Sequence, residues 1–313
     1  APLGQAGGTQ TFSNRAIDAQ WWHQFGSPEL DRLIEQALAK NTDLAVTQAG
    51  LRQARELWLA QRGLLLPWAN AGASSSRVKG SQYLAPVPND STFNYSLQTA
   101  QVNVGYTLDI FGGKRRALEA ASANLEASEY DLRDVLVSLT AEVALNYVDT
   151  RAFQARLSVA DSNLRAQSET FDIARWRNAA GLTTQRDLEQ ARLNLEQTRA
   201  QIPALRNGIS QAVNHIAVLI GQTPGTLNDL LGAPRAIPAA PPDVALGVPA
   251  ETLRRRPDVQ RAERQLATQT AQIGVATAAL YPNFSLIGSI GLEALTAGRL
   301  LTASALATSI GGN

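Results

Sequence analysis

The stretch YTLDIFGGKRRALEA, Tyr106 to Ala120, is where the sequence comes nearest to a recognisable chemical site. A strand-like alternation, two glycines, a lysine and a helix-like segment follow one another, as they do in loops that hold phosphate at the start of a helix. A Walker loop needs a glycine five residues before its Gly-Lys pair and a Ser or Thr directly after it. Here those positions hold Leu108 and Arg115, so the sequence favours a structural junction over a nucleotide site.

Other residues that could do chemistry are few and scattered. There is no cysteine, and His23 and His215 are far apart, so no metal site is predicted and each histidine is expected to make a structural polar contact. No Gly-x-Ser-x-Gly motif occurs, and the Asp and Glu residues are spread over predicted helix faces. The sequence therefore predicts neither an enzyme nor a bound cofactor.

The composition argues against further classes of function. The 313 residues carry 28 Lys+Arg against 27 Asp+Glu, and a net charge of +1 does not favour a nucleic-acid partner. The basic run Arg254-Arg255-Arg256 is expected to be solvated or to contact a neighbouring helix. No run of about 18 apolar residues occurs, so a role in a membrane would have to come through strands. Because the chain has no Met and starts at Ala1, we expect a processed or excerpted sequence.

The first elements that the pattern predicts are two helices and a β-hairpin. Ser27 and Pro28 open a helix as N-cap and first residue, with Leu30, Leu33, Ile34 and Ala37 on one face. A second helix runs from Thr42 to just before Pro67. Two long strands joined by a loop over 81–90 follow, the second from Phe93 to Ile110, with a bulge or bend near 99–101 where the apolar alternation changes phase. The pair Trp21-Trp22 is expected to pack the N-terminal arm onto the body of the protein rather than to anchor at a membrane.

A long helical hairpin comes next. Residues after Gly113 repeat every seven positions, with one step of four from Leu139 to Val143, a stutter in a coiled-coil pattern. No Pro or Gly occurs from 114 to 180, which predicts one helix of about 67 residues and roughly 100 Å. Gly181 is expected at the tip of an antiparallel hairpin, with a second heptad helix that Pro203 kinks and Gly221 ends. The heptad positions are Leu118, Leu125, Leu132, Leu139, Val143, Thr150, Leu157, Leu164 and Phe171, then Leu188, Leu195, Ile202, Ile209 and Ile216.

The end of the chain repeats its beginning at an offset of 215 residues. After a proline-rich linker, Pro257-Asp258-Val259 matches Thr42-Asp43-Leu44, and Leu280-Tyr281-Pro282 matches Leu65-Leu66-Pro67. Each copy passes from a helix across a proline into a strand with small residues. A tandem repeat with an incomplete second copy is predicted.

These features together resemble the TolC-like outer-membrane efflux proteins, in particular the lipoprotein channel subunits of resistance-nodulation-division (RND) pumps. The stretches that carry the resemblance are WWHQFGSPELDRLIEQALAKNTDL, YTLDIFGGKRRALEA, RWRNAAGLTTQRDLEQAR, LIGQTPG and LRRRPDVQRAERQLATQTAQIGVATAALYPNFSLIGSIGL. The resemblance implies a mainly α fold with a membrane β part. In such a protein three subunits form a twelve-stranded barrel and a long α-helical tunnel. This chain is expected to supply three strands and one of two helical hairpins.

The resemblance also sets the expected segments. They are an N-terminal arm (1–27), first-repeat equatorial and tunnel helices (28–66), an outer-membrane β-hairpin (67–111), a long periplasmic helical hairpin (112–221), a Pro-rich equatorial linker (222–249), second-repeat helices (250–281), and a third barrel strand with the start of a loop (282–313).

Two sites follow from the resemblance. The hairpin tip is expected to dock a periplasmic adaptor through Arg177, Gly181, Leu182, Thr183 and Asp187, with Thr183 as a possible cap of the second helix. The alternative is that Arg177 and Asp187 only bind one another across the tip. The second site is the junction of barrel and tunnel, assigned to Asp109, Gly112, Gly113, Lys114 and Arg115.

The expected function is that of a passive exit duct for small toxic compounds in the outer membrane of a Gram-negative bacterium. The implied partners are two further copies of the chain, a periplasmic adaptor, an inner-membrane RND pump and outer-membrane lipid; a lipid anchor would need a Cys that this chain lacks. Two alternatives remain: the duct of a type I protein-secretion system, and a soluble coiled-coil scaffold or adaptor.

Overall fold

The computed structural model describes residues 11–13, 20–79, 94–239, 243–245 and 253–312. The chain divides into two compact units, one drawn from Ala1–Gly50 and Glu129–Gln260 and the other from Leu51–Ser128 and Arg261–Asn313. Helices make up most of the first unit, and an antiparallel sheet with its supporting helices makes up the second.

The core of the first unit forms around helix α1 (Pro28–Lys40). Ser27 is the N-cap and Pro28 the first helical residue, as predicted. The predicted apolar face is confirmed, because Leu30, Leu33, Ile34 and Ala37 are all at most 1% exposed. They pack with residues from the middle of helix α3 (Gly113–Ala179) and the end of helix α4 (Gln185–Leu219).

The N-terminal arm contacts this core through Trp22. Its side chain is buried in the same cluster, and Trp21 and Phe25 pack against it from the 3-10 helix η1 (Trp21–Phe25). The prediction that the tryptophan pair packs the arm onto the body is confirmed. Strand β1 (Thr11–Ser13) pairs in parallel with strand β4 (Asp243–Ala245). The sequence did not predict this contact.

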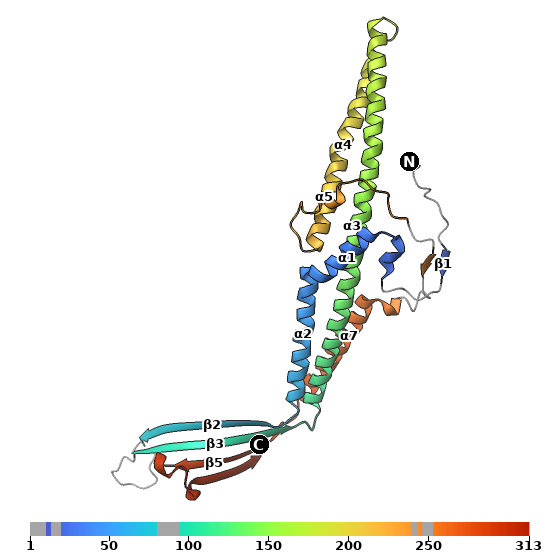
Figure 1. Cartoon of the computed structure of the whole chain (residues 1–313). Coiled ribbons are helices and arrows are strands. Elements are labelled where there is room, and N and C mark those ends of the chain that lie inside the picture. The colour runs from blue at the N-terminus through green and yellow to red at the C-terminus, as the bar shows by residue number, and fades with distance from the viewer. Residues whose placement is uncertain (1–10, 14–19, 80–93, 240–242, 246–252, 313) are drawn as a thin grey trace. The chain divides into compact units, whose positions relative to one another are not determined.

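Helices α3 and α4 lie side by side as an antiparallel hairpin (Figure 1). The bounds of α3 match the predicted 67-residue helix to within one residue, and α4 continues through Pro203. Heptad residues face the partner helix or the core: Leu139, Val143, Thr150, Leu195, Ile202 and Ile216 are buried. The seven-residue repeat in the sequence therefore identifies residues through which the helices pack.

The end of α4 is fixed to the start of helix α2 (Thr42–Gly63). Gly221, with φ of 69°, lets the Gly221 and Gln222 N–H groups donate back to Val218 and Ala217. Asn41 donates to the Leu219 carbonyl (2.9 Å) and accepts from the Leu44 N–H (2.9 Å), so one side chain serves both helix ends.

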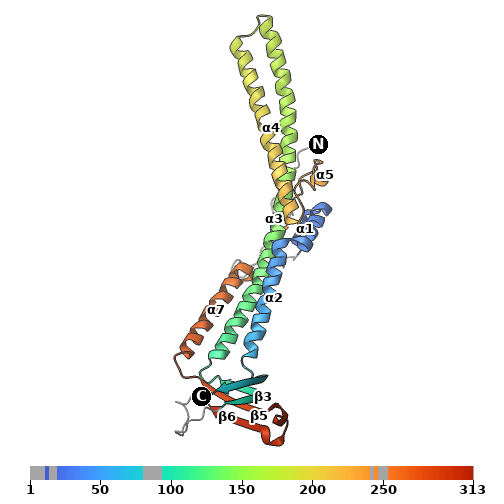
Figure 2. The ribbon, with the colours of Figure 1, turned by 90° about the vertical axis from the view of Figure 1, so that its left-hand side faces the viewer.

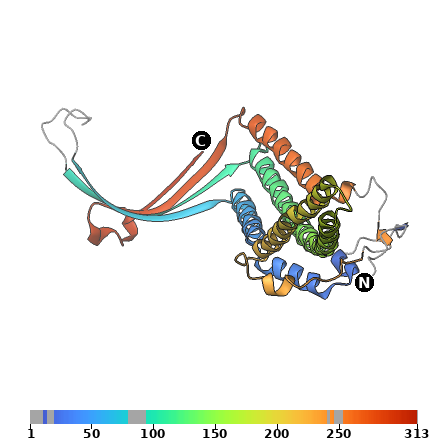
Figure 3. The same ribbon diagram turned by 90° about the horizontal axis from the view of Figure 1, so that it is seen from above.

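The second unit contains a sheet of four antiparallel strands in the order β2-β3-β5-β6, which curve together in Figure 3. The strands are β2 (Trp68–Lys79), β3 (Asn94–Leu108), β5 (Phe284–Ala294) and β6 (Leu306–Gly312). The expectation of three strands ending in a loop is wrong, because β6 pairs with β5 from Leu306 to Gly312. The predicted loop over 81–90 lies outside the described residues.

Of the bulge or bend predicted in β3, the bulge is wrong. Residues 94–105 pair one to one with β2, and residues 98–108 pair one to one with β5. Since side chains alternate across an unbroken strand, the phase change means that apolar residues move from one face to the other. Tyr95 and Leu97 lie on one face, and Val102, Val104 and Tyr106 on the other.

At the end where β3 leads into α3, the register gives the sheet one apolar and one polar face. The apolar face is exposed in this chain, with Ile290 at 55% and Ile310 at 88%. The polar face carries side-chain hydrogen bonds between strands, Ser74 to Thr99 (2.8 Å) and Ser289 to Ser309 (2.7 Å). Its apolar exceptions are Trp68 and Ile287 near α3, and Val78, Tyr95 and Leu97 at the far end of the sheet, where the apolar face carries Arg77, Lys79 and Gln98. The apolar set is Val102, Val104, Tyr106, Leu108, Phe284, Leu286, Ile290, Leu292, Leu306 and Ile310; the polar set is Asn70, Ser74, Ser76, Thr99, Gln101, Asn103, Thr107, Ser285, Ser289, Glu293 and Ser309.

The tandem repeat is visible in the helices that precede the sheet strands. Helix α2 and helix α7 (Pro257–Ala278) both have 22 residues, and their first residues are 215 positions apart. Within the second unit, the segments of α2 and α7 flank the start of α3 (Figure 2). Among the described residues, no helix combines the length and apolar character needed to cross a membrane.

Candidate functional site

The tip of the α3–α4 hairpin is a tight reversal built on Gly181. Gly181 has φ of 70°, and the Leu182 N–H donates to the Arg177 carbonyl (2.9 Å) while the Gly181 N–H donates to Asn178 (2.9 Å). These two hydrogen bonds end a helix on a residue in the left-handed conformation, which glycine adopts at little cost. The predicted role of Gly181 in the reversal is confirmed.

The cap of α4 is Thr184 and not Thr183. Thr184 accepts from the Asp187 N–H (3.3 Å), and Asp187 accepts from the Thr184 N–H (3.1 Å) and hydroxyl (2.7 Å). These bonds to Thr184 hold the pKa of Asp187 below its ordinary value. The reciprocal partners of a capping box are three positions apart, and that spacing joins Asp187 to Thr184.

The alternative that Arg177 and Asp187 bind one another is wrong. The Asp187 carboxylate is used by the capping box, and the described residues show no ion pair between it and Arg177. Arg177 instead contributes its backbone carbonyl to the reversal.

An apolar side chain stands out from this rigid tip. Leu182 is 75% exposed, directly after the glycine, and Trp176, one turn before the end of α3, is 64% exposed. The tip therefore offers a hydrogen-bonded backbone with an exposed apolar surface, which suits binding another protein. The side chains of the tip are not arranged as a catalytic site.

The junction between β3 and α3 is organised by Asp109. Its Oδ1 accepts from the Lys114 N–H (2.9 Å) and its Oδ2 from the Arg115 N–H (3.0 Å). Arg115 also donates through Nε to Oδ2 (3.2 Å), and Lys114 Nζ donates to the Thr107 carbonyl (3.3 Å). The carboxylate thus fills the anion site that a phosphate would need at this helix N-terminus.

Two glycines permit this geometry. Gly112 has φ of 79°, a left-handed conformation, and a Cβ on Gly113 would lie 3.1 Å from Ala278 Cβ on α7. The structure therefore brings all five junction residues together, with Gly112 making the turn and Gly113 allowing close packing of the helices.

The charge state of Asp109 is set by these contacts. Burial raises the pKa of its carboxyl, but the hydrogen bonds from Lys114 and Arg115 lower it by more, so the pKa lies below its ordinary value. A depressed folded-state pKa means that the ionised group stabilises the fold above the unfolded pKa, and that this contribution is lost as the pH falls through the folded value.

Asp109→Ala is expected to lower the free energy of unfolding by about 1–2 kcal/mol at pH 7, the range for losing a helix cap. The difference from wild type should shrink as the pH falls below the ordinary carboxyl pKa of about 4 and through the lower folded-state pKa of Asp109, where the wild-type carboxyl becomes protonated. Thermal unfolding at pH 7 and pH 3 measures both. The control is Asp172→Ala, which removes only a surface pair with Arg175 and should change little. A penalty for Asp109→Ala that is equal at both pH values would contradict this role.

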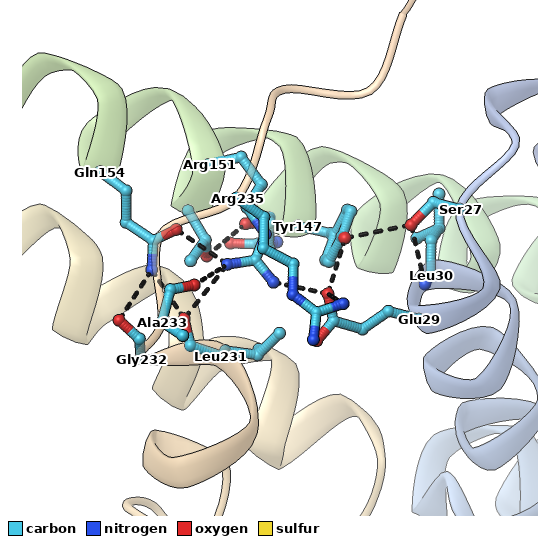
Figure 4. A network of polar contacts seen from close by, with 12 residues as sticks. Ser27, Glu29, Leu30, Tyr147, Arg151, Gln154, Leu231, Gly232, Ala233 and Arg235 are labelled. Carbon is cyan, nitrogen blue, oxygen red and sulfur yellow. Dashed lines mark hydrogen bonds and ion pairs between the residues drawn. The ribbon is translucent and has the colours of Figure 1, made fainter. Parts of the chain in front are cut away.

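A buried polar network, which the sequence did not predict, lies in the first unit (Figure 4). Arg151 on α3 is fully buried and Glu29 on α1 is 8% exposed, and Arg151 Nη2 donates to Glu29 Oε2. Tyr147 donates to the same oxygen (2.8 Å) and contacts Ser27 (3.0 Å). Arg151 Nη1 also donates to Gln154 (2.8 Å) and to the Ala233 carbonyl (2.9 Å).

This network joins three separate parts of the chain. Gln154 donates to the carbonyl of Leu231 (2.6 Å), the last residue of the short helix α5 (Asn228–Leu231), so the linker after α4 is held to α3, and α3 is held to α1. The sequence offers no local signal for this network, because Arg151 is next to the heptad position Thr150 and not on it.

The structure also shows the contacts of the two histidines and of the basic run before α7. His23 pairs with Asp31 (3.0 Å) and His215 lies 3.6 Å from Glu142, so both histidines make the expected polar contacts. Arg256 binds Asp258 (2.6 Å) at the start of α7. Among the described residues, no group of His, Cys, Asp and Glu is arranged to hold a metal ion.

Comparison with known proteins gives one family and several relatives. The family model for "Outer membrane efflux protein" matches residues 33–222. Nodulation protein T of Rhizobium leguminosarum bv. trifolii is 32% identical over 86% of this chain, and the pyoverdine export outer membrane protein OpmQ of Pseudomonas aeruginosa is 34% identical over 87%. The chain covers 57% of each of these relatives, so it spans little more than half of their length.

Solved structures agree with this match. The outer-membrane channel OprN superposes with a TM-score of 0.90 at 35% identity, over all of this chain and 70% of that one. The CmeC outer membrane channel of Campylobacter jejuni gives a TM-score of 0.83 at 25% identity, over 96% of this chain and 64% of that one.

Proposed function

This chain belongs to the outer membrane efflux protein family, and we propose that it is part of a passive exit duct in a Gram-negative outer membrane. The observation that carries the proposal is the sheet, which has one apolar and one polar face at its end next to α3 and is joined through Asp109–Gly112 to a 67-residue helix. A membrane protein puts such an apolar face against lipid and such a polar face toward water.

The duct is proposed to form from three copies of the chain. In the sheet order, β2 and β6 are the outer strands, and strand edges cannot stay unpaired in lipid. Further copies would pair these edges and close a barrel, and the exposed apolar residues of the long helices, such as Leu145 at 61% and Val218 at 60%, would contact neighbouring subunits.

The proposed cargo is small toxic compounds, and the proposed partners are a periplasmic adaptor and an inner-membrane RND pump. Support comes from relatives whose names state pyoverdine export or toluene efflux. The adaptor is proposed to dock at the hairpin tip, where Leu182 is exposed on a reversal that is rigidly hydrogen-bonded. A lipid anchor supplied from outside this chain is part of the same proposal.

A protein-secretion duct would share this architecture, whereas a soluble scaffold would not. A scaffold needs only the helical hairpin, and an exposed apolar sheet face that includes Ile290 and Ile310 would be a liability for it in water. The sheet therefore favours a membrane duct over a scaffold.

The protein that carries this chain is expected to form a heat-modifiable trimer and to give discrete conductance steps in a planar lipid bilayer. The steps should appear without ATP or any other energy source, because a duct is a water-filled passage that excludes lipid. No chemical reaction is needed for conduction through it. The control is heat-denatured protein at the same concentration. A monomer that leaves the bilayer silent would overturn the proposal.

A further inference from the structure

A groove of about 780 Å³ lies beside the junction, between the start of α3 and the end of α7. One wall is an aromatic pair, Phe111 and Tyr281, whose rings stack at 4.6 Å with 14° between their planes. The other wall is basic and contains Arg115 and Arg116. Both aromatic rings remain about half exposed, so the groove is open at its surface.

The arginine Arg116 is held in this groove by a specific helix contact. A Cβ on Gly274 of α7 would lie 2.9 Å from Arg116 Cγ and 3.0 Å from its Cδ, so the absence of a side chain at 274 leaves room for the arginine stem. Arg116 donates through Nη1 to Glu119 (2.6 Å) and is 55% exposed. A guanidinium has five N–H donors, so most of its donors remain for a ligand.

The local charge balance favours an anion. Arg115 pairs with the Asp109 carboxylate and Arg116 with the Glu119 carboxylate, while Lys114 Nζ donates to the Thr107 carbonyl. The Asp109 carboxylate accepts two backbone N–H groups at the start of α3, so much of its charge is already compensated by the helix end. Arg115, 67% exposed, keeps free donors beyond its bonds to Asp109. The helix N–H groups themselves are occupied and do not form the site.

We propose that this groove binds the phosphate of a phospholipid headgroup in the periplasmic leaflet, with Arg116 and Arg115 on the phosphate and Phe111 and Tyr281 against the glycerol and first acyl carbons. The proposal rests on the proposed membrane position, because the groove lies just beyond Leu108 and Phe284, the last apolar-face residues of β3 and β5 at this end of the sheet. Aromatic side chains prefer this interfacial level, and basic pockets there bind lipid headgroups.

The test measures lipid binding to the whole detergent-purified, delipidated protein by native mass spectrometry. The probes are phosphatidylglycerol, a diacylglycerol with the same chains, and inorganic phosphate as a competitor. Arg116→Gln should weaken phosphatidylglycerol binding about five-fold per site, the effect of one cation near an anionic lipid. Arg116→Lys keeps the charge and should retain most of the binding. The matched control Arg62→Gln removes an exposed arginine that lies over Trp58 on α2, outside the groove, and should change nothing.

Each outcome decides the assignment. Preference for phosphatidylglycerol over diacylglycerol that depends on Arg116 and survives millimolar phosphate supports the lipid site. Equal binding of both lipids, equal loss in Arg62→Gln, or full displacement by inorganic phosphate overturns it. Conductance of the same samples in a bilayer separates the two proposals, since a conducting protein without headgroup preference loses only the lipid site.

Discussion

Arg151→Met is expected to lower the free energy of unfolding by roughly 3–5 kcal/mol, the range measured when one partner of a buried ion pair is removed. The variant leaves the Glu29 carboxylate, 8% exposed, with a hydroxyl donor from Tyr147 but without its buried cation. It also removes the donors that hold the Ala233 carbonyl and the Gln154 side chain. Thermal unfolding followed by circular dichroism measures the loss.

The matched control for Arg151 is Arg235, because it approaches the same carboxylate. Its Nη1 lies 3.7 Å from Glu29 Oε2, but its side chain is 60% exposed. Arg235→Met should therefore change stability by less than about 1 kcal/mol. The double variant Glu29→Gln with Arg151→Met should recover part of the loss, since no charge is then left buried without its partner. Equal effects of Arg151→Met and Arg235→Met would show that burial of the pair is not what matters.

Leu182→Asp is expected to reduce crosslinking of the adaptor to the tip by roughly 30-fold or more, as for a central interface residue. The substitution replaces a 75% exposed apolar side chain by a charge and leaves the Gly181 reversal and the Thr184 capping box in place. Site-specific crosslinking in cells that express the cognate adaptor measures the effect, and the trimer should persist on a gel.

A second leucine separates docking from a general effect of added charge. Leu193 is 49% exposed on α4, about two turns beyond the first residue of the helix, Gln185, and Leu193→Asp should leave adaptor crosslinking near the wild-type level. If Leu182→Asp crosslinks as well as wild type, the tip does not dock through this residue.

The helices could be predicted closely from the sequence because their signals are local. Heptad spacing, the glycines at 181 and 221 and the Ser27-Pro28 start each act within a few residues, and the helix bounds follow them. The repeat at 215 positions also predicted α7 from α2. The junction residues around Gly112 were found for the same reason, since their contacts span only six positions.

Strand partners and buried polar contacts depend on distant parts of the chain, and these were missed. Strand β6 contains mostly small residues, and only its pairing with β5 distinguishes it from a loop. Glu29 and Arg151 are 122 positions apart, and nothing near either residue indicates the other. At the tip, Thr183 and Thr184 differ by one position, and only the reciprocal bonds with Asp187 decide which is the cap.

The open outer edges of β2 and β6 have a consequence for how the protein is made. A single subunit that entered lipid alone would carry unpaired backbone groups along both edges, each of which costs several kcal/mol there. Insertion would then be tied to encounter with other subunits, and its rate should rise more steeply than linearly with subunit concentration. If the subunits assemble in the membrane as proposed, a cell that makes few copies would hold unassembled chains in the periplasm, exposed to proteases. The abundance of the assembled protein would then depend on the timing of synthesis as well as on its total amount.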